Sequence, residues 1–186
     1  MDDSALTQVL ADYRDAFEKK EFAEADSDSD PLMEAFGITP TLKAANRQYW
    51  GRELGMCWQR LCVALCAQRC GNRFAPPPKV GGDEPYDLRV DDLAIDTKYR
   101  IGSGDSGTLK KFKANGAELT KEGLTPTMLI LRTDNLRAAI GACEVGGWDV
   151  QQGDAAFALV RELTGFDLRS WLVERKGQFP ILPPDD

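Results

Sequence analysis

Residues 85–98 read PYDLRVDDLAIDTK, and this stretch predicts a β-hairpin that turns at Asp91-Asp92. In the expected register, Leu88 lies opposite Ile95. Side chains alternate between the two faces of a strand, so one face of the hairpin is apolar and the other is charged. A register shifted by one residue would mix the two sets, which favours a loop with an even number of residues. The apolar face carries Leu88, Val90, Leu93, Ile95 and Tyr99, and the charged face carries Asp87, Arg89, Asp96, Lys98 and Arg100.

The charged face places the carboxylates of Asp87 and Asp96 opposite each other. Cross-strand carboxylates repel, so such a pair indicates a shared proton or a bound cation. Two Asp side chains with open positions suit Mg²⁺, which prefers carboxylate and water ligands. Lys98 lies two residues along the same face, where it could orient a water molecule or stabilise charge on a phosphate. Such a site can hydrolyse a phosphodiester without histidine, and the chain contains no histidine. The alternative is a ladder of exposed salt bridges, which would contribute little stability.

The sequence around the hairpin predicts an α/β (α+β) fold, in which helices flank a mixed sheet. A stripe of apolar residues at helical spacing predicts a long helix from about Thr41 to Cys70, with Gly71 as its C-terminal cap. The nearly continuous apolar run at 125–133 predicts a strand that is buried on both faces. Further helices are expected at about 5–24, 108–115, 135–145, 154–164 and 167–176.

The spacing D-x₈-D-x-K on a hairpin resembles the signature of the PD-(D/E)xK nuclease superfamily. The core of that superfamily is a helix, a mixed sheet containing a hairpin, a second helix and a further strand. The order of elements expected from about residue 43 to 133 is similar to this core. The resemblance implies that Asp87 and Asp96 bind Mg²⁺ and that Lys98 assists the water nucleophile. One departure is that Tyr86 separates the proline from the first aspartate.

Many members of this superfamily also use a glutamate from the preceding helix. Glu53 is the candidate here, as a ligand of the metal or of the attacking water, because it lies at the edge of the apolar stripe. The alternative is an ordinary surface charge beside Arg52 and Arg60.

A glycine-rich loop, GSGDSG, and a basic helix follow the hairpin. The loop lacks the ending of a P-loop, but its glycines allow close approach to a ligand, and a helix N-terminus favours a phosphate. Arg and Asp side chains can also read base edges. The alternative is a flexible turn with a solvated lysine face. The expected DNA contacts are Arg100, Ser103, Asp105, Ser106, Thr108, Lys110, Lys111 and Lys113.

This loop and basic helix resemble those of type II restriction endonucleases of the superfamily. The resemblance implies a homodimer that cuts double-stranded DNA at a specific sequence with Mg²⁺ as cofactor. A repair or junction-resolving nuclease of the same fold would read structure rather than sequence. A non-catalytic module that binds DNA or protein, and an acidic regulatory protein, are further alternatives.

The net charge of −7 is concentrated at the N-terminus, where residues 1–36 carry eleven acidic and three basic side chains. The remaining residues carry 19 acidic and 20 basic side chains, so this part of the chain could tolerate a polyanion. We therefore expect an acidic helical segment at 1–36 and a nuclease domain at 37–186.

Composition also limits the location of the chain. It contains no apolar run of membrane-spanning length, and its acidic N-terminus does not resemble a secretory signal. Five cysteines, an odd number, indicate reduced thiols and a cytoplasmic protein without membrane partners. Free cysteines are among the most buried residues, so buried, inert thiols are expected.

Overall fold

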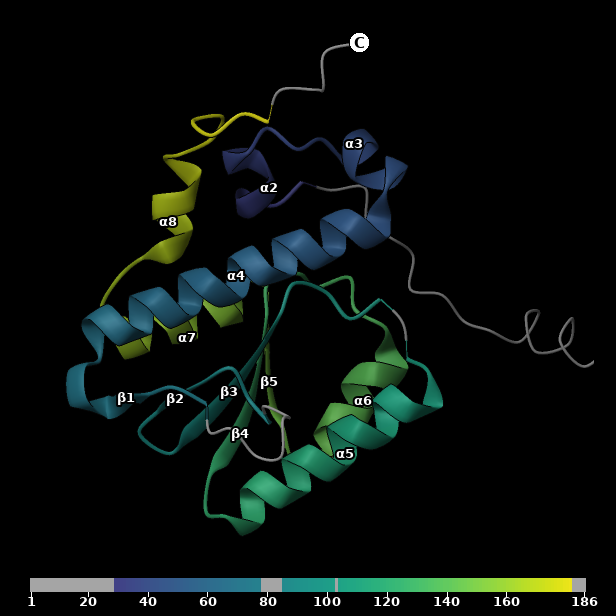
Figure 1. Ribbon diagram of the computed structural model, residues 1–186, viewed down its shortest axis with the longest axis vertical. Coiled ribbons are helices and arrows are strands. Elements are labelled where there is room, and N and C mark those ends of the chain that lie inside the picture. Colours follow the sequence, from purple (N-terminus) through teal and green to yellow (C-terminus); the bar gives the residue numbers. More distant parts are fainter. Residues whose placement is uncertain (1–28, 78–84, 103, 182–186) are drawn as a thin grey trace, which may run out of the picture.

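The computed structural model describes residues 29–77, 85–102 and 104–181, which form a five-stranded mixed sheet with helices on both faces (Figure 1). The strand order is β1-β2-β3-β4-β5. The first three strands are antiparallel, whereas β4 runs parallel to β3 and β5 runs parallel to β4. The expected mixed sheet flanked by helices is confirmed. The strands are β1 Phe74–Ala75, β2 Leu88–Val90, β3 Leu93–Lys98, β4 Thr125–Ile130 and β5 Asp149–Gln152.

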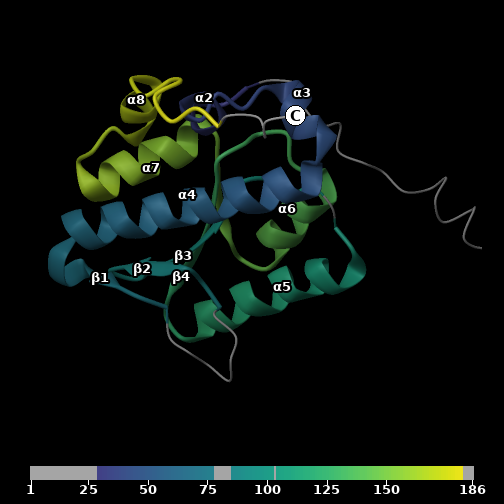
Figure 2. The ribbon, with the colours of Figure 1, turned by 45° about the horizontal axis from the view of Figure 1, so that its top comes forward.

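Helices α4 and α7 cover one face of the sheet, and α5 and α6 cover the other (Figure 2). The short helices α2 and α8 pack against each other beside α4. Within the described ranges, no helix combines the length and the apolar character needed to cross a membrane. The helices are α2 Pro31–Ala35, α3 Pro40–Ala45, α4 Arg47–Arg69, α5 Ser106–Lys121, α6 Arg137–Val145, α7 Asp154–Thr164 and α8 Leu168–Val173.

The β2–β3 hairpin has the register expected from the sequence. Leu88 pairs with Ile95 and Val90 pairs with Leu93, so the loop contains two residues. Asp91 has a φ of 52°, a left-handed conformation that tight two-residue turns use and that Asp tolerates better than most residues. The alternation of apolar and charged side chains therefore predicted the register of β2 and β3 correctly. The Asp87 carboxylate, expected on the charged face, instead accepts hydrogen bonds from the hydroxyl of Thr97 and from Gln59, on the side of α4.

Each face of the sheet has its own apolar core. The apolar face of the hairpin packs under α4, where Trp58 is fully buried and donates from Nε1 to the carbonyl oxygen of Leu129 at 3.2 Å. The opposite face contains Ala94, Met128 and Ile130, which pack under α5 and α6. The charged face of the hairpin is therefore partly covered, unlike the exposed ladder of salt bridges that was the alternative.

Several elements differ from expectation. Strand β1 and helix α2 were not expected, and α5 is longer than the helix expected at about 108–115. The helix predicted from about Thr41 is interrupted at Asn46, whose side chain accepts from the backbone N–H of Tyr49 and caps α4. Strand β5 was not expected, because its sequence, DVQQ, contains one apolar residue and lies half-exposed beside β4. Its place next to a buried parallel strand, rather than its composition, makes it a strand.

The packed unit begins before the expected domain boundary. Leu32 and Met33 of α2 are almost completely buried, and Asp30 is buried beside them. The division expected between residues 36 and 37 therefore runs through the core. The helix expected at about 5–24 lies outside the described residues.

Candidate active site

The Asp87 carboxylate lies where β2, β3 and α4 meet. Oδ2 accepts hydrogen bonds from the backbone N–H of Thr97 at 2.7 Å and from its Oγ1 at 2.6 Å. Oδ1 accepts from Nε2 of Gln59, on α4, at 2.6 Å. The backbone N–H of Asp87 donates to the carbonyl oxygen of Ile95 at 2.9 Å. Three donors on two elements therefore fix the orientation of this carboxylate.

Asp96 and Lys98 follow on β3, two residues apart and therefore on one face of the strand. The Lys98 ammonium lies 2.5 Å from Oδ1 of Asp96 and 3.3 Å from the carbonyl oxygen of Thr97. The side chain of Asp96 is only 16% exposed, and that of Lys98 is 34% exposed. The ion pair is thus partly removed from solvent, where Coulomb interactions are stronger than on the surface.

The electrostatics of Asp96 connect these residues into one site. Burial and, to a smaller extent, the nearby Asp87 carboxylate raise the pKa of Asp96 to about 6, against the opposing effect of Lys98. Burial is the main reason that Asp96 resists ionisation despite a lysine at 2.5 Å. Two carboxylates beside one ammonium also leave a local excess of negative charge. A cation would relieve that excess. The structure thus brings together Asp87, Asp96 and Lys98.

The donor set fits a hard divalent cation in part. Two carboxylates, with water in the remaining positions, are a ligand set that Mg²⁺ accepts. Both oxygens of Asp87 already accept hydrogen bonds, although each carboxylate oxygen has more than one lone pair. Within the described ranges, no group of three or more His, Cys, Asp or Glu side chains is arranged to hold a metal ion. A cation at this site would therefore depend on Asp87 and Asp96.

Glu53 has a different position from the one expected. Its side chain is 44% exposed, and its carboxylate pairs with Arg52, with Oε1 2.9 Å from Nη2. The residue of α4 that contacts Asp87 is Gln59, which the sequence analysis did not identify. Gly55 lies on the face of α4 that meets the sheet, since a Cβ there would lie 3.8 Å from Cβ of Tyr99. Gln59 is one turn further along this face.

The expected DNA contacts fall into two groups. Arg100 is mostly buried and pairs with Asp134, with Nε 2.7 Å from Oδ2. Asp105 caps α5 and accepts from the backbone N–H groups of Gly107 and Thr108, and also from Oγ1 of Thr108. These contacts give Arg100, Asp105 and Thr108 structural roles. Ser103 lies outside the described residues. The other expected contacts are exposed on α5, namely Ser106, Lys110, Lys111 and Lys113.

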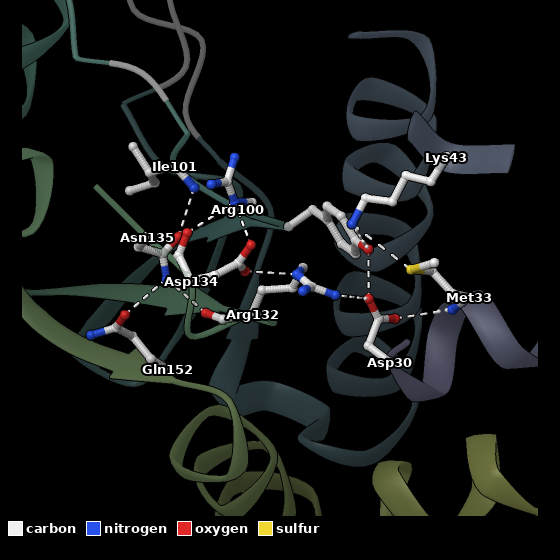
Figure 3. A network of polar contacts seen from close by, with 10 residues as sticks. Asp30, Met33, Lys43, Arg100, Ile101, Arg132, Asp134, Asn135 and Gln152 are labelled. Carbon is white, nitrogen blue, oxygen red and sulfur yellow. Dashed lines mark hydrogen bonds and ion pairs between the residues drawn. The ribbon is translucent and has the colours of Figure 1, made fainter. Parts of the chain in front are cut away.

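A buried polar network, here called the Asp30–Arg132 network, begins at the residue after Lys98 (Figure 3). Asp30 Oδ2 accepts from the hydroxyl of Tyr99 at 2.5 Å and from Nη1 of Arg132 at 3.0 Å. Nζ of Lys43, on α3, donates to the Tyr99 hydroxyl at 2.9 Å. Burial, followed by the charge of Arg132, lowers the pKa of Lys43 to about 8. The network ties the end of β3 to α2 and α3.

The same network continues across the ends of the parallel strands. Asp134 accepts from Nε of Arg132 through Oδ1 and from Nε of Arg100 through Oδ2, both at 2.7 Å. Asn135 accepts from the backbone N–H of Ile101 at 2.7 Å and donates to Oε1 of Gln152 at 2.8 Å. The segments that follow β3 and β4 are thereby joined to the end of β5.

The five cysteines are free thiols, and all except the half-buried Cys57 are buried, largely as expected. Burial raises the pKa of Cys66 to about 12 and that of Cys143 to about 11, and it raises the pKa of Cys62 well above its ordinary value. These three thiols remain protonated and therefore poor nucleophiles near neutral pH.

Comparison with known proteins gives no match, whether to a family model, to a curated protein or to a solved structure. The function of the chain is therefore inferred from its own residues.

Proposed function

We propose that this protein is a Mg²⁺-dependent endonuclease that hydrolyses double-stranded DNA and resembles type II restriction enzymes of the PD-(D/E)xK superfamily. One observation carries the proposal. Asp87, Asp96 and Lys98 meet on one hairpin, where burial and then the nearby Asp87 carboxylate raise the pKa of Asp96. Perturbed carboxyl groups beside a lysine are typical of hydrolytic sites.

The order of elements supports the proposal. Helix α4 precedes three antiparallel strands, and α5 then leads to β4, which lies parallel to β3. The superfamily core that the sequence resembles has this order. Asp87 lies one residue before β2, and Asp96 and Lys98 lie in β3, which are the places that the signature requires. A restriction-endonuclease-like core is therefore part of the proposal.

Each residue of the site receives a role from its contacts. Asp87 and Asp96 would hold Mg²⁺, which supplies Lewis-acid polarisation of the phosphate and makes a bound water more acidic. Lys98 orients the attacking water and stabilises negative charge on the phosphate. Gln59 and Thr97 keep the Asp87 carboxylate in position. Glu53 pairs with Arg52, so we leave it out of the proposed ligand set.

DNA would be bound mainly through its phosphates. The exposed lysines of α5, Lys110, Lys111 and Lys113, are suited to such contacts, which would make binding depend on salt concentration. Arg100 and Asp105 have structural partners, so the residues that would read the base sequence are not among these two. A homodimer would place one site on each strand of the duplex.

Digestion of plasmid and linear DNA by the purified protein tests the proposal. Discrete fragments in Mg²⁺, and none in EDTA, would support a sequence-specific endonuclease. Cleavage confined to branched or flapped substrates would instead indicate a junction-resolving or repair nuclease. Salt-dependent DNA binding without cleavage in Mg²⁺ or Mn²⁺ would contradict the proposal and favour a non-catalytic binding module.

A further inference from the structure

We propose that the Lys98 ammonium is an internal counterion of Asp96 in the metal-free protein, and that a divalent cation must displace it in order to bind. This inference rests on the proposed function, because it concerns the same two carboxylates. It adds a competition between a residue of the chain and the cofactor. Binding of the ion would then release Lys98 at the moment when the site becomes competent.

The contacts of Lys98 are those that a cation would make. Its Nζ lies 2.5 Å from Oδ1 of Asp96 and 3.3 Å from the carbonyl oxygen of Thr97. Carboxylate and backbone carbonyl oxygens are also the ligands of hard metal ions. Because Asp96 is only 16% exposed, little room remains for water to screen two cations beside the same carboxylate. The ammonium and a divalent ion would therefore compete for it.

The rest of the site determines which partner gives way. Asp87 is fixed by Thr97 and Gln59, and Asp96 is rooted in β3 by a short side chain. Lys98 carries its charge on a flexible four-carbon stem and is 34% exposed, so the ammonium can swing toward solvent without disturbing the strand. Once it has turned toward solvent, the Lys98 ammonium could contact a phosphate of the substrate.

The competition has a measurable consequence. Removing the ammonium leaves the carboxylates without their internal cation, so a divalent ion should bind more tightly, on the order of tenfold for a partly desolvated pair. If Lys98 had only a structural role, its removal would not increase the affinity for the divalent ion. If Lys98 helped to assemble the ion site, its removal would lower that affinity.

Ion binding to the full-length protein without DNA provides the test, with Mg²⁺ followed by calorimetry and Tb³⁺ by luminescence. The variant is Lys98→Met, and the matched control is Lys121→Met. Lys121 also pairs with a carboxylate, that of Glu118 at 3.1 Å, but it is 74% exposed near the end of α5. We expect about tenfold tighter binding for Lys98→Met and less than a twofold change for the control. Unchanged or weaker binding by Lys98→Met would overturn the inference.

Two further Lys98 variants and a separate cleavage assay complete the test. Lys98→Arg retains a cation and should keep the ion affinity near that of the wild type, whereas Lys98→Gln should behave like Lys98→Met if the methionine variant does not fold. Cleavage of DNA by the wild type is measured separately. Wild-type cleavage without a gain in ion affinity would reject the counterion while leaving the nuclease in place. A gain without cleavage would support the counterion and reject the nuclease.

Discussion

Two polar clusters lie next to each other along β3 and differ in charge balance and in burial. In the candidate active site, Asp96 has one cationic partner, Lys98, and a second carboxylate that raises its pKa. In the Asp30–Arg132 network, Asp30 accepts hydrogen bonds from Tyr99, Arg132 and two backbone N–H groups at the start of α2. The first cluster has excess negative charge near solvent, whereas the second is neutralised and buried.

This difference separates a site whose net charge a cation could neutralise from a network that stabilises the fold. A buried charge is stable when each of its polar atoms has a partner, and Arg132, only 5% exposed, is bonded to both Asp30 and Asp134. Two neighbouring carboxylates that share one ammonium keep a net negative charge, which a further cation would neutralise. Substitutions in the two clusters should therefore affect different properties.

Asp96→Asn should have the largest effect, and the effect should be on activity. Loss of a proposed metal ligand should slow DNA cleavage by roughly a thousandfold. The folded state should keep its stability, because the amide no longer repels Asp87. Single-turnover cleavage and thermal unfolding of the same preparation measure the two quantities. A large fall in the melting temperature would mean that Asp96 is instead a structural residue.

Arg132→Met, in the Asp30–Arg132 network, should instead lower the stability of the folded protein. It leaves Asp30 and Asp134 buried without their shared cation, which should cost about 3 kcal/mol in the free energy of unfolding. Urea denaturation gives this value, with Lys121→Met as an exposed control that should cost less than about 0.5 kcal/mol. Equal stability of the two variants would remove the distinction between the clusters.

A matched pair of substitutions on α4 sharpens the boundary of the site. Gln59→Ala removes a hydrogen bond to the Asp87 carboxylate and should lower the cleavage rate about tenfold. Glu53→Ala should change the rate by less than about twofold, because Glu53 has an exposed ion pair with Arg52. The reverse order of effects would restore Glu53 as the functional residue of this helix.

The smallest effect concerns the pH dependence of stability. The pKa of Lys43 is about 8 in the folded protein, below its usual 10.5, so the unfolded chain binds more protons between these values. The penalty for burying the charged lysine is complete below pH 8 and disappears as the pH rises toward 10.5. Relative to Lys43→Met, the wild type should therefore gain stability between pH 7.5 and pH 10 in urea titrations. A constant difference between the two proteins would show that Lys43 is not perturbed.

The hairpin could be predicted because its information is local. Alternation over a few residues determined which side chains share a face, and the pairing of Leu88 with Ile95 followed from it. The same pattern placed Asp96 and Lys98 together. The two-residue turn and the buried strand β4 were predicted for similar reasons.

The contacts that were missed join distant parts of the chain. Gln59 and Asp87 are 28 residues apart, and Asp30 and Arg132 are 102 residues apart. Helical spacing identifies the buried stripe of α4, but it does not determine how the helix lies over the sheet, so Glu53 and Gln59 could not be distinguished. Asp30 was grouped with an acidic segment because its composition matched its neighbours, whereas its burial depends on Arg132.

Whether Asp87, Asp96 and Lys98 form one metal-dependent hydrolytic site is decided by comparing DNA cleavage by the wild type and by Lys98→Ala. Both proteins are first compared for DNA binding in Ca²⁺ and for thermal stability, and then for single-turnover cleavage in Mg²⁺. We expect discrete fragments from the wild type, none from Lys98→Ala, and similar DNA affinity for the two proteins. Cleavage by Lys98→Ala at the wild-type rate, or no cleavage by the wild type, would contradict this expectation.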